Sequence, residues 1–158
     1  MSELSHFDET GASRMVDVGD KPVSRRMARA SARVTMLPAT LKLVVDRQTS
    51  KGNVFEVARL AGIMAAKRTP ELIPLCHSLG LDSVELQFEV TSDSTVMIEA
   101  VAKTEARTGV EMEAMTAVSV AALTVYDMCK AVDREMAIGP ILLLEKSGGK
   151  SGHFVRGS

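Results

Sequence analysis

The sequence predicts an α+β domain, because segments with the two-residue period of strands are interspersed with segments that have the periodicity of helices. The predicted order is strand, helix, helix, strand, strand, helix, strand. This order is typical of a ferredoxin-like sandwich, in which helices cover an antiparallel four-stranded sheet. A length of 158 residues, 46% of them hydrophobic and 25% charged, is enough for one domain with its own core.

The first predicted strand begins at Arg26 and alternates strictly, with alanine at 28, 30 and 32 on one face and polar side chains on the other. Pro38 suits the first turn of a short helix over residues 37–46. A second helix is predicted from Gly52 to Lys67, where Thr69-Pro70 ends it.

Two further alternating segments, residues 83–90 and 96–103, are joined by the hairpin loop TSDST. The longest predicted helix runs from about Met112 to Val132 and is apolar almost all round. The last strand covers residues 138–144, and Pro140 favours an edge position or a strand start for it.

Composition limits the partners and the compartment. We expect a flexible arm over residues 1–14, a single domain over 15–145 and a flexible tail over 146–158. The polar N-terminus and the lack of a long apolar run predict neither a secretion signal nor a membrane span, so two free cysteines favour the cytoplasm. A net charge of −1 and only five aromatic residues argue against nucleic-acid binding, including RNA binding on the sheet.

The long helix carries ionisable side chains in a regular pattern. Asp127 and Lys130 are three residues apart and share a face, and Glu113 precedes Asp127 by nearly a whole number of turns. An exposed ion pair would explain Asp127 and Lys130 alone. On so apolar a helix, however, these groups would lie near apolar walls, where desolvation moves pKa values toward those that acid–base catalysis uses.

Two other segments are candidates for ligand contact. Cys76 and His77 are adjacent and lack further metal-binding spacing, so we expect no metal site, and the loop that holds them serves either packing or ligand contact. Lys51 and Gly52 precede a helix N-terminus, where backbone N–H groups and the helix dipole favour an anion.

The C-terminal stretch KSGGKSG, residues 146–152, contains the GGKS of a phosphate-binding P-loop. A P-loop would need glycine where Leu144 stands and a helix after the motif, so that interpretation fails. What remains is Lys146 and Lys150 on a Gly/Ser-rich segment, which either folds over phosphate groups or is a frayed chain end.

Taken together, the segments resemble one family, the cyclic pyranopterin monophosphate synthases, also called molybdenum cofactor biosynthesis protein C. The resemblance covers nearly the whole chain after the arm. It is carried by four stretches: Met15–Val18, Lys51–Leu79, Thr108–Val132 and Ile138–Gly152. One departure is Ser78, where the family's LCHPL motif has proline.

The resemblance implies an enzyme that converts 3′,8-cyclo-7,8-dihydro-GTP, a small-molecule substrate, into cyclic pyranopterin monophosphate and releases diphosphate. The net reaction requires no cofactor, although Mg²⁺ could accompany the substrate triphosphate. The resemblance also implies a homohexamer, built as a trimer of dimers, with sites at the subunit boundaries.

The resemblance assigns roles to residues as well. It implies a catalytic set of Asp127, Lys130 and Lys51, without fixing which is the acid and which the base. The implied substrate-binding residues are Leu75, Cys76, His77, Met112 and Glu113, with Arg26, Lys146 and Lys150 available for the triphosphate. A non-catalytic nucleotide-sensing module is the alternative, and it would bind a GTP-type ligand without turnover.

Overall fold

The computed structural model describes residues 4–47 and 52–157. Lys51 therefore lies outside the described residues. The elements are β1 (Ser24–Thr35), α1 (Pro38–Val45), α2 (Val54–Lys67), α3 (Thr69–Leu72), β2 (Ser83–Val90), β3 (Thr95–Ala106), α4 (Glu111–Cys129), β4 (Ala137–Ser147) and β5 (Phe154–Val155). The predicted α+β class is confirmed. None of the helices in this described part has the length and apolarity that a membrane crossing needs.

The strands form one open antiparallel sheet in the order β2-β3-β1-β4-β5. The prediction of four strands is wrong, because β5 adds a fifth by pairing Val155 with Glu145 and Phe154 with Lys146. A strand of two residues is too short to produce an alternating pattern, so the sequence carries no signal for it. Pro140 lies near the start of β4, on a stretch that β5 does not reach.

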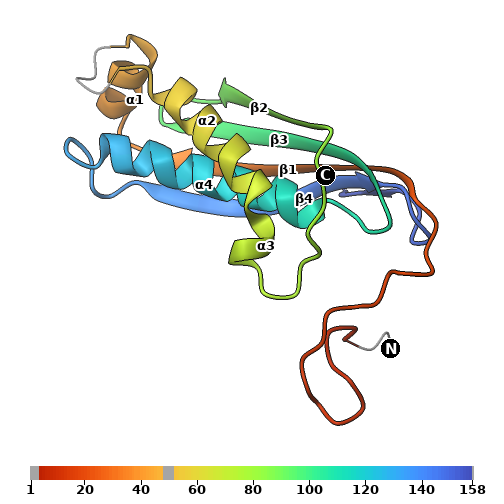
Figure 1. Cartoon of the computed structure of the whole chain (residues 1–158). Helices are drawn as coiled ribbons and strands as arrows, with labels where there is room; N and C mark the ends of the chain where they lie inside the picture. The colour runs from red at the N-terminus through yellow and green to blue at the C-terminus, as the bar shows by residue number, and fades with distance from the viewer. Residues whose placement is uncertain (1–3, 48–51, 158) are drawn as a thin grey trace.

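Helices cover one face of this sheet, as expected (Figure 1). The alanines at 28, 30 and 32 of β1 are fully buried, and so are Ala100 and Ala102 of β3. They belong to the same core as a series of small residues on α4: Ala114, Ala117, Ala121 and Ala122. Small side chains on both sides at these positions let α4 pack closely against β1 and β3.

Most element ends lie within a few residues of their predicted positions. The second predicted helix begins two residues late, at Val54, because the Asn53 side chain caps it by accepting a hydrogen bond from the N–H of Glu56 at 3.3 Å. Thr69-Pro70 does end α2, but these residues also start the short helix α3, which the sequence does not predict. The last strand extends through Ser147, into the segment expected to be a tail.

Gly62 marks the place where α2 comes closest to α4. A Cβ atom at position 62 would lie 2.9 Å from the carbonyl oxygen of Ala117 and would also overlap the side chain of Leu86. Backbone atoms of α4 cannot rotate away as the end of a side chain can. Glycine at 62 therefore permits the close crossing of the two helices.

We predict that Gly62→Ala destabilises the protein even though alanine is the better helix former. The gain in helix propensity is about 1 kcal/mol, whereas overpacking of a core costs typically about 1–3 kcal/mol. The net loss in the free energy of unfolding, up to about 2 kcal/mol, would be measured by urea denaturation. Gly80→Ala is the control, because a Cβ there meets no atom within 4 Å. Equal stability of the two variants would contradict the tight crossing.

Candidate active site

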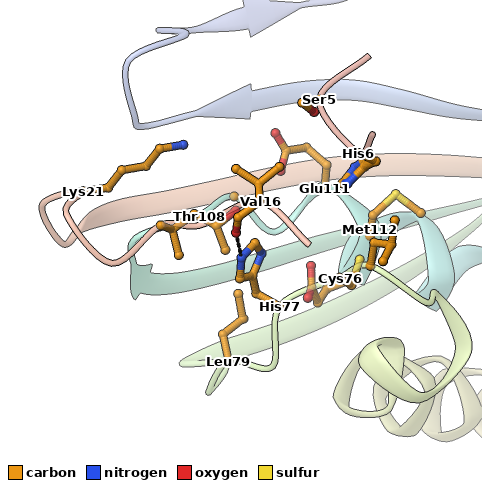
Figure 2. Close-up of a pocket in the computed structure, with 14 residues that line it drawn as sticks. Ser5, His6, Val16, Lys21, Cys76, His77, Leu79, Thr108, Glu111 and Met112 are labelled. Carbon is orange, nitrogen blue, oxygen red and sulfur yellow. Dashed lines mark hydrogen bonds between the residues drawn. The ribbon is translucent and has the colours of Figure 1, made fainter. Parts of the chain in front are cut away.

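Two hollows adjoin each other at the end of the molecule where α4 begins. The first, which we call the histidine pocket, has a volume of about 330 Å³ and lies between the N-terminal segment, the loop after α3 and the first turn of α4 (Figure 2). All five residues predicted to bind the ring part of a substrate line it: Leu75, Cys76, His77, Met112 and Glu113. The structure thus brings together two segments more than thirty residues apart in the sequence.

His77 is fixed in the pocket by the N-terminal segment. Its Nε2–H donates a hydrogen bond of 2.5 Å to the carbonyl oxygen of Val16 (Figure 2). A neutral imidazole held in this way carries its proton on Nε2 and has Nδ1 left as an acceptor. The contact sets the orientation of the ring and explains why the stretch Met15–Val18 belongs to the site.

Glu113 contributes a carboxyl group with an unusual environment. The residue is 3% exposed, although it lies in the first turn of α4. Burial raises the pKa of its carboxyl group, its own backbone N–H acts in the opposite direction, and the charge of Glu111 raises the pKa further. A carboxylate in this position is a strong acceptor for N–H groups of a ligand, because burial leaves it few water molecules as partners.

Cys76 has a thiol pKa that is raised by burial first, and then by the charges of Glu113 and Glu111. A raised pKa keeps the thiol protonated near neutral pH, and the thiolate is the nucleophilic form. The raised pKa of the thiol and the place of Cys76 in the pocket lining favour ligand contact over nucleophilic catalysis.

The second hollow, which we call the basic cleft, has a volume of about 600 Å³. Five cationic side chains and one carboxylate line it: Lys21, Arg26, Arg107, Lys146, Lys150 and Glu111. The three predicted phosphate-binding residues are among them, so the structure brings Arg26, Lys146 and Lys150 to one place. Such a concentration of positive charge, in a chain whose net charge is −1, is suited to a polyanion.

The glycines of the tail allow it to lie against β1 at this cleft. Gly148 and Gly149 have φ angles of 94° and 79°, a region that side chains disfavour. A Cβ on Gly148 would overlap the backbone oxygen of Arg25, and one on Gly149 would overlap the guanidinium of Arg26. The Arg26 side chain is also held at its Nε, which donates to the carbonyl oxygen of Ala106 at 3.3 Å.

The two hollows share one wall, which consists of Lys21, Thr108, Gly109 and Glu111. Lys21 extends along this wall in Figure 2. Thr108 and Gly109 of this wall come just before α4 and Glu111 begins it, and the N-terminal dipole end of the helix favours negative charge. A single ligand with a polar ring at one end and phosphates at the other could therefore occupy both.

The predicted catalytic residues of the long helix lie elsewhere. Asp127 and Lys130 form an ion pair of 2.6 Å near the end of α4, with side chains 62% and 53% exposed. Fourteen residues separate Asp127 from Glu113, which at a rise of about 1.5 Å per residue is about 21 Å along the helix. Within one chain the expected stripe of three desolvated groups is absent, because only Glu113 is covered by neighbouring elements.

Within residues 4–47 and 52–157, no cluster of three His, Cys, Asp or Glu side chains could hold a metal ion.

Comparison with known proteins shows the family of the chain. A sequence model of the MoaC family matches residues 15–149. The chain belongs to the MoaC family. A relative from Magnetococcus marinus named cyclic pyranopterin monophosphate synthase is 62% identical over 157 residues, which are 99% of this chain and 96% of the relative. A second, from Heliobacterium modesticaldum and of the same name, is 59% identical over 99% of both chains. Cyclic pyranopterin monophosphate synthase 1 of Mycobacterium tuberculosis is 59% identical over 97% of this chain and 90% of its own.

Sequence reasoning did not single out Lys21, Arg107 or Glu111 of this MoaC chain. Lys21 and Arg107 are in irregular segments, where charged residues follow no period. Arg107 could have been noticed by its place, since it follows β3 and precedes the Thr108-Gly109 pair that leads into α4. A cation just before a helix N-terminus strengthens an anion site.

We predict that Gly148→Ala weakens the binding of inorganic triphosphate about tenfold, which corresponds to about 1.4 kcal/mol. The new methyl group would force the segment away from Arg25 and carry Lys150 with it. Gly152→Ala is a matched control, because Gly152 also has a positive φ, of 71°, but a Cβ there meets no atom within 4 Å. Calorimetric titration would measure the triphosphate affinity of both variants. Equal affinities would show that the close contact of Gly148 with β1 does not matter for anion binding.

We also predict that Glu113→Gln stabilises the fold at neutral pH. Because the folded-state pKa of Glu113 lies above the ordinary glutamate value of 4.5, its contribution to stability is fully present below pH 4.5 and is lost as pH rises through the folded-state pKa. The neutral amide removes this loss. Urea unfolding at pH 8 and pH 5 should therefore give a larger advantage for the variant at pH 8. A variant less stable than wild type at pH 8 would contradict the proposed cost of burying the charge.

Proposed function

We propose that this chain is a cyclic pyranopterin monophosphate synthase of molybdenum cofactor biosynthesis, a lyase. It converts 3′,8-cyclo-7,8-dihydro-GTP into cyclic pyranopterin monophosphate and releases diphosphate. The observation that carries the proposal is the junction of the histidine pocket with the basic cleft through a shared wall. This junction suits a substrate that has a purine-derived ring system at one end and a triphosphate at the other. The names of the MoaC relatives support the same reaction.

In this proposal the histidine pocket holds the ring system. Glu113 accepts hydrogen bonds from the guanine-type N–H edge, since an ionised carboxylate only accepts. His77 and Cys76 contact the rings from the opposite segment. Arg26, Lys146 and Lys150 bind the triphosphate and stabilise the charge that develops on the departing diphosphate. Lys21 and Arg107 add to the same positive field.

The catalytic set that we propose is Asp127, Lys130 and Lys51, acting as general acid and base in the rearrangement of the rings. Two of the three, Asp127 and Lys130, come 14 and 17 residues after Glu113 of the same chain, which corresponds to about 21 Å and about 25 Å along the helix axis. A reaction site that contains both ends must then be assembled from two chains. We therefore propose the homohexamer, a trimer of dimers, in which one subunit brings Asp127 and Lys130 to the pocket of another.

Three further proposals accompany this function. The strand order β2-β3-β1-β4, with helices between β1 and β2 and between β3 and β4, supports a ferredoxin-like fold to which β5 is added. The reaction needs no redox cofactor, and Mg²⁺ enters only with the substrate triphosphate. A pathway that starts from a nucleotide is expected in the cytoplasm.

The direct test is to mix the purified protein with 3′,8-cyclo-7,8-dihydro-GTP and to measure cyclic pyranopterin monophosphate and diphosphate. We predict that Lys130→Ala lowers kcat by at least about 100-fold, the lower range for loss of a general acid or base. Lys42→Ala is a matched control, because Lys42 forms a comparable exposed ion pair of 2.5 Å with Asp46 on α1. The kcat of Lys42→Ala should stay within about twofold of the wild-type kcat.

Two outcomes would contradict the proposal in different ways. Full turnover by a folded Lys130→Ala protein would remove Lys130 from the catalytic set. Saturable binding of a GTP-type ligand by the wild type, with no turnover of the precursor, would instead indicate the nucleotide-sensing module.

A further inference from the structure

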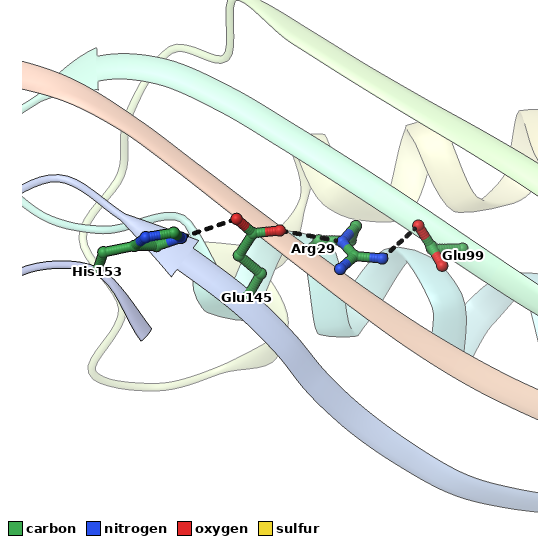
Figure 3. Close-up of polar contacts among 4 residues, drawn as sticks. All are labelled: Arg29, Glu99, Glu145 and His153. Atoms are coloured by element: carbon green, nitrogen blue, oxygen red, sulfur yellow. Dashed lines mark hydrogen bonds and ion pairs between the residues drawn. The ribbon is translucent and has the colours of Figure 1, made fainter. Parts of the chain in front are cut away.

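A row of charged side chains crosses the sheet on the face that the helices leave open. Arg29 of β1 donates from Nη1 to Oε1 of Glu99 at 3.1 Å and from Nε to Oε2 of Glu145 at 3.3 Å (Figure 3). The other carboxylate oxygen of Glu145 contacts Nε2 of His153 at 2.8 Å. The row thus connects β3, β1 and β4 with the residue that directly precedes β5.

Charge explains why His153 matters to this row. Two carboxylates share one guanidinium, so the three strand residues together carry an excess negative charge. The side chain of Glu145 is only 22% exposed, and water cannot fully solvate it. An N–H of His153 offsets part of that charge. The hydrogen bond from His153 is also the largest of the influences that lower the pKa of Glu145, ahead of Arg29.

The row closes the base of a hairpin. Glu145 lies near the end of β4 on one side of it, and His153 directly precedes β5 on the other. Backbone pairing of β4 with β5 also holds the two sides of the hairpin together. Arg156 adds two hydrogen bonds, from its backbone N–H to the carbonyl oxygen of Leu144 (2.8 Å) and from its Nε to the carbonyl oxygen of Leu143 (2.7 Å). Within the hairpin, Lys146 contacts the hydroxyl of Ser151.

The hairpin is also one wall of the basic cleft. Lys146, Gly149, Lys150 and Ser151 all face it. Lys146 belongs to β4 and pairs with Ala28 of β1, whereas Lys150 and Ser151 lie between glycines with positive φ at 149 and 152, in the least restricted part of the hairpin. Its direction depends on what holds its two ends.

We propose that His153 is a positioning residue for anion binding: its hydrogen bond to Glu145 anchors the hairpin to the central strands and holds Lys150 over the basic cleft, beside Lys146. His153 does not line the cleft and does not touch the ligand in this account. The anion is a triphosphate group. That this group belongs to the cyclic GTP-derived substrate rests on the proposed function, whereas the anchoring does not.

The first experiment uses no substrate. Inorganic triphosphate is titrated calorimetrically into wild type, His153→Ala and His153→Gln. Loss of one hydrogen bond to a partly exposed carboxylate should weaken binding about three- to tenfold in His153→Ala. The glutamine amide N–H can replace the donor, so His153→Gln should return to within about twofold of wild type. Asp46→Asn, which breaks a remote exposed ion pair, is the control and should bind as wild type does.

A second measurement follows the hairpin itself. Trypsin can cut after the exposed Lys150, and mass spectrometry reports the rate. Cleavage should be faster in His153→Ala and slow again in His153→Gln, while thermal unfolding changes little. With 3′,8-cyclo-7,8-dihydro-GTP, His153→Ala should lower kcat/KM by a similar three- to tenfold, and His153→Gln should restore it, because the lysine that His153 positions acts on the triphosphate and on the departing diphosphate.

The results separate the two proposals. Unchanged triphosphate affinity and unchanged cleavage in His153→Ala would overturn the anchoring, and so would a defect that His153→Gln does not repair. Absence of turnover in the wild type would overturn the proposed synthase activity alone, since the titration and the cleavage still decide whether His153 anchors the hairpin.

Discussion

The close packing of α4 on β1 and β3 is the constraint on which the rest of the molecule depends. Fully buried alanines on both sides bring the helix against the strands, and Gly62 brings α2 against the helix in turn. This packing fixes the start of α4, and with it Glu111, Met112 and Glu113. The loop that follows α3 is carried to the same point by α2, so Cys76 and His77 meet the first turn of α4. The geometry of the site is therefore a consequence of small side chains in the core.

A nearly neutral chain obtains a strongly charged site by distributing its charges unevenly. Five cations line the basic cleft, while the buried carboxylate of Glu113 lies in the pocket next to it. Glu111 lines both hollows. Opposite charges at a short distance give a ligand only one favourable orientation, with N–H groups toward Glu113 and phosphates toward the lysines. A net charge of −1 argues against a general attraction for nucleic acid. The local cluster of cations instead attracts the phosphate groups of one ligand.

The fold could be predicted from the sequence wherever burial imposes a period. The alternation in β1, β2 and β3 and the apolar surface of α4 made the class and the antiparallel sheet predictable. β5 has only two residues and carries no such signal, which is why the sheet was expected to have four strands. Periodicity places Glu113 and Asp127 near one line of a helix, but it gives only the direction of each side chain around the helix axis. It does not say that the sheet and loops cover one of them and leave the other exposed.

The C-terminal segment KSGGKSG is a second case in which the sequence indicates a function but not the structure that supports it. Glycine and lysine in KSGGKSG indicate phosphate binding, but they do not say what holds the lysines in place. In a P-loop a helix N-terminus follows and supplies both rigidity and charge. Here β1 supplies the surface on which Gly148 and Gly149 lie, and a row from Glu99 to His153 fixes the ends of the hairpin. Rigidity then comes from the sheet and charge from the lysines. A flexible glycine segment can bind a polyanion with little loss of entropy only if its ends are already fixed, and the cross-sheet row is the element that fixes them.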